Sequence, residues 1–292
     1  MRIRQKTKLL LSVVEFIKYI DLGAAPRSWN DLTRAQILFI CELFSRGKEE
    51  NNFLTRIALH VFKLKPLKAL REGEFFLFLQ GRKRIILSPE QVTSLSKKFS
   101  WLKETSDLTK QKLPEVRIGL RKYYGPDDKL FNLTFAEYQT AENFYLAFNK
   151  TRDQKYLDLL VATLYRRQIK NYRRIRNATA FKGDRREDFN DYLVESRVKK
   201  IRRLNIAKKF AIYQYFMGCM SHLQKTYPLV IQESKAIAGT DKIYNHTMLI
   251  EFLKGDDINA DPLKENVYQI MARCQRDRLR QQYIENMKKN GI

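Results

Sequence analysis

The feature that most constrains the fold of this chain is the repeated occurrence of helix-start signals, each followed by an apolar stripe with helical spacing. In a capping box, a Ser or Thr side chain and a Glu or Gln three residues later each accept a hydrogen bond from the other's backbone N–H. Candidate boxes are Thr33 with Gln36, Ser88 with Gln91, and Thr134 with Glu137. Because such boxes begin helices, we expect a mainly helical protein.

The apolar stripes predict where the helices run. We expect helices at about 33–46, 54–62, 89–102, 135–148, 154–165, 189–203, 206–225, 243–253 and 262–289. One region instead has strand character, because the apolar runs 75–79 and 84–87 flank the short basic turn Gly81, Arg82, Lys83. This pattern predicts a β-hairpin at about 75–87 with a basic tip.

These elements predict a mainly α fold, with a small α+β N-terminal part that holds the one hairpin, followed by an all-α helical domain. The polar stretch 103–114 and the turn-rich residues 123–128 separate the two parts. We therefore expect an N-terminal domain at 1–102, a linker and turn-rich loop at 103–132, and a basic all-α domain at 133–292.

The charge of the chain is unusual for a globular protein. The 292 residues include 56 Lys and Arg against 32 Asp and Glu, which gives a formal net charge of +24. More than half of this excess lies in residues 150–225, which hold 20 basic and 7 acidic residues. A polyanion is the natural partner for such a concentration of positive charge.

Two clusters in this region are the candidate polyanion-binding site. Its residues are Arg166, Arg167, Lys170, Tyr172, Arg173, Arg174, Arg176, Arg185, Arg186, Arg197, Lys199, Lys200, Arg202 and Arg203. Arginine side chains match phosphate or carboxylate oxygens in pairs, and a tyrosine ring between them can stack on a base or a guanidinium plane. Three interpretations remain open: a nucleic-acid backbone, an acidic protein face in an assembly, and a solvated face without a partner.

The residue patterns favour a binding protein over an enzyme. The histidines at 60, 222 and 246 stand singly, and the sequence contains no GxSxG, HExxH or P-loop motif. The paired aspartates at 127–128 and 256–257 lie in turn-like contexts, where Asp is favoured for turn geometry alone. Neither catalytic residues, nor a metal site, nor a cofactor is expected.

The chain is expected to work inside the cell. The cysteines at 41, 219 and 274 are far apart, which predicts neither disulfides nor a zinc site and fits a reducing compartment. The apolar run at 9–14 is short and is followed by Glu15 and Lys18, so we expect neither a signal peptide nor a membrane span.

Residues 133–225 also resemble a group of structural-module proteins of bacteriophages and prophages. The resemblance lies in Leu133 to Phe135, Glu142 to Tyr145, Tyr156 to Asp158, Ala162 to Arg166, Gly183 to Asn190 and Phe216 to Cys219. The chain departs from the pattern at Arg167, where the group is expected to have proline. The resemblance implies a virion or assembly component of the tail or head–tail region, cytoplasmic in a bacterial host or in the virion.

Together, the charge and the resemblance predict a non-enzymatic structural or assembly protein of a phage-like particle. Its basic surfaces would contact DNA or acidic subunits, and it would act as an oligomer or within a larger assembly. The alternative is a nucleic-acid-binding accessory protein without sequence specificity.

Overall fold

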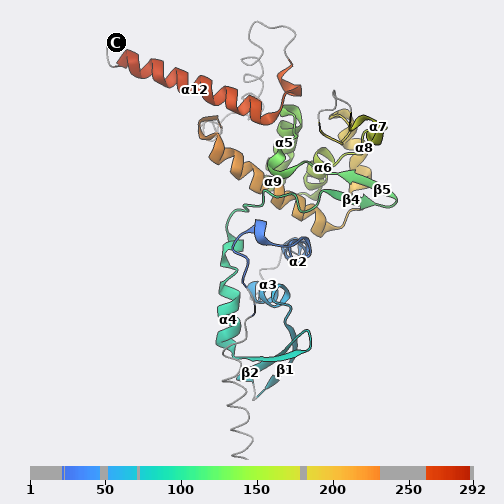
Figure 1. The fold of residues 1–292 in the computed structure, drawn as a ribbon, viewed down its shortest axis with the longest axis vertical. Coiled ribbons are helices and arrows are strands. Elements are labelled where there is room, and N and C mark those ends of the chain that lie inside the picture. Colours follow the sequence, from blue (N-terminus) through green and yellow to red (C-terminus); the bar gives the residue numbers. More distant parts are fainter. Residues whose placement is uncertain are drawn as a thin grey trace, which may run out of the picture. The chain divides into compact units, whose positions relative to one another are not determined.

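The structure, a computed structural model, describes residues 22, 24–46, 52–70, 73–177, 183–230 and 261–289 (Figure 1). The predicted helix at 243–253, His246, the Asp256–Asp257 pair and the apolar run at 9–14 lie outside the described residues. The chain divides into two compact units, Met1–Glu104 and Thr105–Ile292. Each unit is described by itself.

The first unit combines short helices with a small sheet. Its elements are η1 (Trp29–Asp31), α2 (Arg34–Ser45), α3 (Phe53–Val61), β1 (Lys65–Leu70), β2 (Phe75–Gln80), β3 (Lys83–Leu87), α4 (Pro89–Lys97) and η3 (Ser100–Lys103). The predicted capping boxes at the starts of α2 and α4 are both formed. Trp29, Ile40, Ile57 and Phe99 are among the side chains of its core.

The predicted hairpin is confirmed as β2 and β3, with Phe78 paired to Ile85 at its centre. A third strand, β1, extends this antiparallel sheet along the other edge of β2. The sequence analysis did not predict β1, because its residues are almost all exposed and therefore lack the alternation of a half-buried strand. Pro66 is tolerated there because an edge strand leaves one side unpaired.

The second unit is mainly helical. Its elements are β4 (Glu115–Ile118), β5 (Arg121–Tyr124), η4 (Asp128–Leu130), α5 (Phe135–Thr151), α6 (Gln154–Leu164), α7 (Tyr172–Ile175), α8 (Tyr192–Ile201), α9 (Ile206–Thr226), η5 (Pro262–Lys264) and α12 (Val267–Lys289). Helix α6 is central and packs against α5, α8 and α9 (Figure 1). Every residue from Leu157 to Leu164 is buried, since neighbours cover α6 on several sides.

The fold class predicted from the sequence is therefore confirmed, with one further addition. Residues 115–124, within the segment expected to be a linker and turn-rich loop, form the antiparallel hairpin β4–β5. Gly119, at φ +59°, supplies the left-handed conformation that its two-residue turn requires. Tyr124 at the end of β5 pairs with Arg166 just after α6, which fixes the hairpin to the helical part of this unit.

Candidate polyanion-binding site

The structure separates the predicted site residues into two groups with opposite environments. Arg166 and Arg186 are 2% exposed, and Arg197 is 6% exposed. Tyr172 and Arg185 are half-buried. The remaining residues are exposed; these exposed cations are Arg167, Lys170, Arg173, Arg174, Arg176, Lys199, Lys200, Arg202 and Arg203.

Arg186 is held by a complete set of acceptors inside the second unit. Its Nη1 donates to Oε1 of Glu137 at 2.7 Å and to the Leu164 carbonyl at 3.1 Å. Its Nε and Nη2 donate to the Asp184 carboxylate at 3.0 and 2.8 Å. Burial by itself would lower the pKa of this guanidinium, but the charges of Glu137 and Asp184 raise it above its ordinary value.

Arg166 shares the same two carboxylates. Its Nη1 lies 2.8 Å from Oε1 of Glu137 without making a hydrogen bond, and its Nη2 lies 3.7 Å from Oδ2 of Asp184. The guanidinium also lies over the ring of Phe189, 5.7 Å from its centroid. Glu137, Arg166, Asp184 and Arg186, the buried ion network, thus balance two positive charges against two negative ones.

Arg197 is the third buried arginine. Its Nη1 donates to the Ala162 carbonyl of α6 at 2.7 Å, and its Nε lies 3.5 Å from Oε1 of Glu187. Burial lowers the pKa of Arg197, and the attraction of Glu187 acts against this. Lys209, which follows the second cluster in sequence, is likewise buried and lies 2.6 Å from Oδ1 of Asp158.

These contacts correct part of the site prediction. Arg166, Arg186 and Arg197 already meet carboxylates of their own chain and are not available to a partner. For Arg197, the sequence indicates this internal position, because Arg197 lies on the same helical face as Val194 and Ile201, which are both buried. Glu137 was predicted to close a capping box with Thr134; the Thr134 hydroxyl does accept from the Glu137 amide, but the carboxylate binds the arginines.

The exposed cations lie in the segment after α6, in α7 and its flanks, and at the C-terminal end of α8. Among the described residues, none of them makes an ion pair with a carboxylate. Lys199 and Lys200 occupy the last turn of α8, where the helix dipole favours positive charge. Arg173 and Arg174 likewise lie in the last turn of the short helix α7, whereas Arg167 has no such local explanation.

The hairpin β4–β5 adds cations that the sequence analysis did not include. Arg121 lowers the pKa of Lys200 more than any other cause, ahead of burial and Arg167, so Arg121 and Arg167 each lie near Lys200. The guanidinium of Arg185 lies over the ring of Tyr124 in β5, 4.0 Å from its centroid. The available sequence signal for this hairpin was Gly119, because Gly at the first position of a two-residue turn is typical of tight hairpins.

The acidic residue of the hairpin is already engaged. Nζ of Lys122 lies 2.9 Å from Oε1 of Glu115, across the two strands. The hydrogen bond from Lys122 is the main cause that lowers the pKa of Glu115, with smaller effects from Arg117 and Arg185. Glu115 therefore neutralises Lys122 and leaves Arg117 and Arg121 as positive charge.

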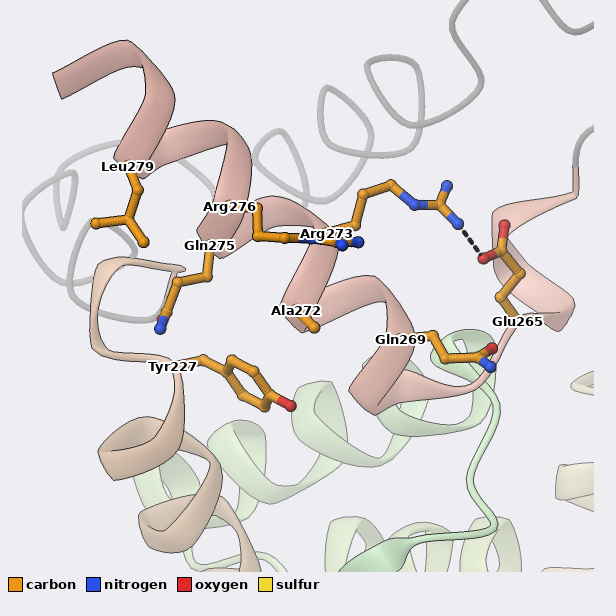
Figure 2. A pocket seen from close by; sticks show the side chains of 8 residues that line it. All are labelled: Tyr227, Glu265, Gln269, Ala272, Arg273, Gln275, Arg276 and Leu279. Atoms are coloured by element: carbon orange, nitrogen blue, oxygen red, sulfur yellow. Dashed lines mark hydrogen bonds and ion pairs between the residues drawn. The ribbon is translucent and has the colours of Figure 1, made fainter. Parts of the chain in front are cut away.

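A separate pocket of about 650 Å³ lies between the end of α9 and helix α12 (Figure 2). Its lining includes Tyr227, Ala272, Arg276 and Leu279, and Arg273 is paired with Glu265 at its edge (Figure 2). The lining holds neither histidine nor cysteine. Across the described part of the chain, no group of three or more His, Cys, Asp or Glu side chains is arranged to hold a metal ion.

His60 and the three cysteines pack against neighbouring groups inside the protein. His60 stacks on Phe39 with ring centroids 3.8 Å apart, and burial lowers its pKa. Cys41, Cys219 and Cys274 are buried, which raises the pKa of each thiol. None of the helices in the described ranges combines the length and apolar character that a membrane crossing requires.

Comparison with known proteins found no match: no family model, no curated protein and no solved structure is similar to this chain at a significant level.

Proposed function

We propose that this chain is a non-enzymatic structural or assembly protein of a phage-like particle that binds the phosphate backbone of DNA through its exposed cations. The observation that carries the DNA-binding part is the division of the basic residues. Arg166, Arg186 and Arg197 are neutralised internally, whereas the exposed cations lack a carboxylate partner among the described residues. Charges that the fold leaves uncompensated are available to an external anion.

The chemistry of the exposed cations favours phosphate. Six of the nine are arginines, whose planar guanidinium donates two parallel hydrogen bonds to a phosphate. Half-buried Tyr172 lies among them in α7. Contacts to phosphate position a protein on DNA but carry no base information, so the proposed binding depends on charge and not on base sequence.

The assembly part of the proposal rests on the resemblance of residues 133–225 to phage structural-module proteins. Mass spectrometry of purified particles from the source organism tests it. Detection of this chain at a fixed ratio to the capsid and tail proteins would support a place in the particle. Its absence from both finished particles and assembly intermediates would favour the alternative, an accessory protein that binds nucleic acid outside the particle.

Gel-shift titrations with duplexes of unrelated sequence test the DNA-binding part. In the test variant, Glu replaces Arg173, Arg174, Lys199 and Arg203, which reverses the charge at these four positions. We expect similar wild-type affinities for all duplexes, and a salt dependence whose slope in the variant falls by about 3 to 4, because about one counterion is released for each phosphate neutralised.

A matched control reverses four exposed lysines elsewhere, Lys98, Lys103, Lys155 and Lys225, and so changes the net charge by the same amount. It should keep most of the wild-type affinity, because local contacts and not overall charge hold the DNA. Absence of wild-type binding at low salt, or equal losses in the two variants, would refute the DNA-binding proposal. Binding to an acidic polypeptide but not to DNA would refute it in favour of an acidic protein partner.

A further inference from the structure

Three of the exposed positive charges come from segments that are distant in sequence. Arg121 lies on β5, Arg167 follows α6, and Lys200 lies in the last turn of α8. All three are exposed. The following inference rests on the proposed function, since it concerns how the same surface holds the DNA.

Buried contacts bring these three segments to the same end of α6. Tyr124 and Arg166 exchange two backbone hydrogen bonds, N to O at 2.7 and 3.1 Å, which join β5 to the residue before Arg167. The guanidinium of Arg197 donates to the Ala162 carbonyl at 2.7 Å, which attaches α8 to the last turn of α6. The hairpin and α8 are thus both held to residues 162–166.

The residue spacing along β5 and along α8 places Arg121 and Lys200 on the faces of these elements that also carry Tyr123 and Arg197. Arg121 lies two residues before Tyr123 and shares its face of the strand. Lys200 lies three residues after Arg197 and shares its face of the helix. Tyr123 is 1% exposed, and its charge is among those that influence the pKa of Arg197, so β5 and α8 approach each other here, and Arg121 and Lys200 are the exposed neighbours of this inner pair.

This juxtaposition of like charges is unfavourable for the isolated protein. Arg121 and Arg167 both lower the pKa of Lys200, as expected when neighbouring positive charges disfavour its protonated form. Glu115 pairs with Lys122, and Glu187 lies 3.5 Å from Nε of Arg197. Within the part of the chain that the structure describes, none of Arg121, Arg167 and Lys200 makes an ion pair with a carboxylate. An external anion would remove the repulsion.

We propose that Arg121, Arg167 and Lys200 form one phosphate-binding site that holds a single backbone phosphate of duplex DNA. The two guanidinium groups donate paired hydrogen bonds to phosphate oxygens, and the lysine adds a compact positive charge. All three side chains of the site are exposed, so it is not enclosed. A free phosphate ion therefore gains few contacts there, whereas a backbone phosphate is held by the other cations along the strand.

A double-mutant cycle with Arg121→Ala, Lys200→Ala and the double variant tests the shared phosphate. Each single variant should weaken duplex binding several-fold, and the loss in the double variant should differ from the product of the single losses by at least about threefold, because groups that share a partner are coupled. Arg121→Ala combined with Arg174→Ala is the control pair. Its losses should multiply, since those residues are assigned to separate phosphates.

Titration of the intact protein by NMR distinguishes the source of the phosphate. The side-chain Nε–H signals of Arg121 and Arg167 should shift together at micromolar duplex, and with inorganic phosphate only at much higher concentrations. Saturation by micromolar inorganic phosphate would overturn the assignment to a DNA backbone.

The two proposals fail in different ways. If wild-type protein does not bind duplex DNA, the proposed function is wrong. If the wild type binds and the reversal of Arg173, Arg174, Lys199 and Arg203 abolishes binding, but Arg121→Ala binds as wild type, only this inference is wrong. Multiplicative losses for Arg121→Ala and Lys200→Ala would also overturn it, because the two cations would then contact separate phosphates.

Discussion

Arg166 and Arg167 are neighbours in sequence, but the fold gives them opposite environments. Arg166 is 2% exposed and lies between Glu137 and Asp184, whereas Arg167 is exposed and close to Lys200. The same contrast separates Arg197 from Lys199 and Lys200 within α8. The basic sequence of this unit therefore contains two kinds of positive charge: one holds the fold together, and the other is presented to solvent.

The difference shows why a count of basic residues overstates a binding surface. Charge that is paired inside the protein contributes little to the electrostatic field outside it, and removal of such a charge lowers the free energy of unfolding. Charge without an internal partner contributes little to stability, and removal of such a charge lowers the affinity for a binding partner. The contrast predicts that substitutions in the two groups have separable effects.

The largest effect is expected from Glu137→Ala. Glu137 is fully buried and faces both Arg166 and Arg186, so its removal leaves two buried guanidinium groups with half of their counter-charge. We expect a loss of about 3 to 5 kcal/mol in the free energy of unfolding, measured by urea denaturation. If Glu137→Ala does not fold, Glu137→Gln serves in its place.

The matched control for this experiment is Glu115→Ala. Glu115 also pairs with a cation, Lys122, but both side chains are partly exposed to water, which screens the pair. Its loss of stability should be much smaller than that of the Glu137 variant. Equal losses in the two variants would contradict a structural role specific to the buried ion network.

An intermediate effect is expected within α8, where Arg197→Ala and Lys199→Ala differ by two positions. Arg197→Ala removes the hydrogen bond to the Ala162 carbonyl and a buried side chain, so stability should fall by about 2 kcal/mol. Lys199→Ala should change stability by less than about 0.5 kcal/mol. Thermal unfolding of both variants, followed by circular dichroism, measures the difference; a reversed order would contradict the division of α8 into two faces.

A smaller effect on stability, but a clear effect on binding, is expected from Arg167→Ala. This side chain is exposed, so its loss should alter the unfolding free energy by less than about 0.5 kcal/mol. Its loss should weaken duplex binding several-fold but lower the salt slope by less than about 1, because Arg121 and Lys200 still contact the shared phosphate. An Arg167→Ala protein that is strongly destabilised but binds normally would invert the proposed roles of Arg166 and Arg167.

The smallest effect concerns pH. Arg121 and Arg167 lower the pKa of Lys200 in the free protein, whereas a bound phosphate favours the protonated lysine. DNA affinity should therefore fall as the pH rises through this lowered pKa. At a pH where Lys200 is partly deprotonated in the free protein, DNA binding should be accompanied by uptake of a proton by Lys200. In Arg121→Ala the fall should move to higher pH, which fluorescence anisotropy titrations across the alkaline range would detect; an unchanged profile would argue against proximity of the two cations.

Several elements of the fold could be predicted from local patterns. The capping boxes at Thr33 and Ser88 and the hairpin at 75–87 depend on residues a few positions apart, so the sequence specifies them directly. β1 and the β4–β5 hairpin were not predicted, because an exposed strand shows no alternation and a short one provides few positions for a pattern. Of the candidate site, the sequence offered two signals: Arg197 falls on the apolar face of α8, and Gly119 is typical of the tight turn between β4 and β5.

The sequence by itself determined that this chain forms capped helices and one predicted hairpin, and that its positive charge is concentrated in residues 150–225. Only the tertiary structure decided which of those charges face inward, because the carboxylates that receive them lie far away in the chain. Glu137 accepts a hydrogen bond from Arg186 across 49 positions, and Arg121 lies near enough to lower the pKa of Lys200 because β5 and α8 are both anchored at the end of α6. Electrostatic interactions depend on distance in space, and folding alone sets that distance.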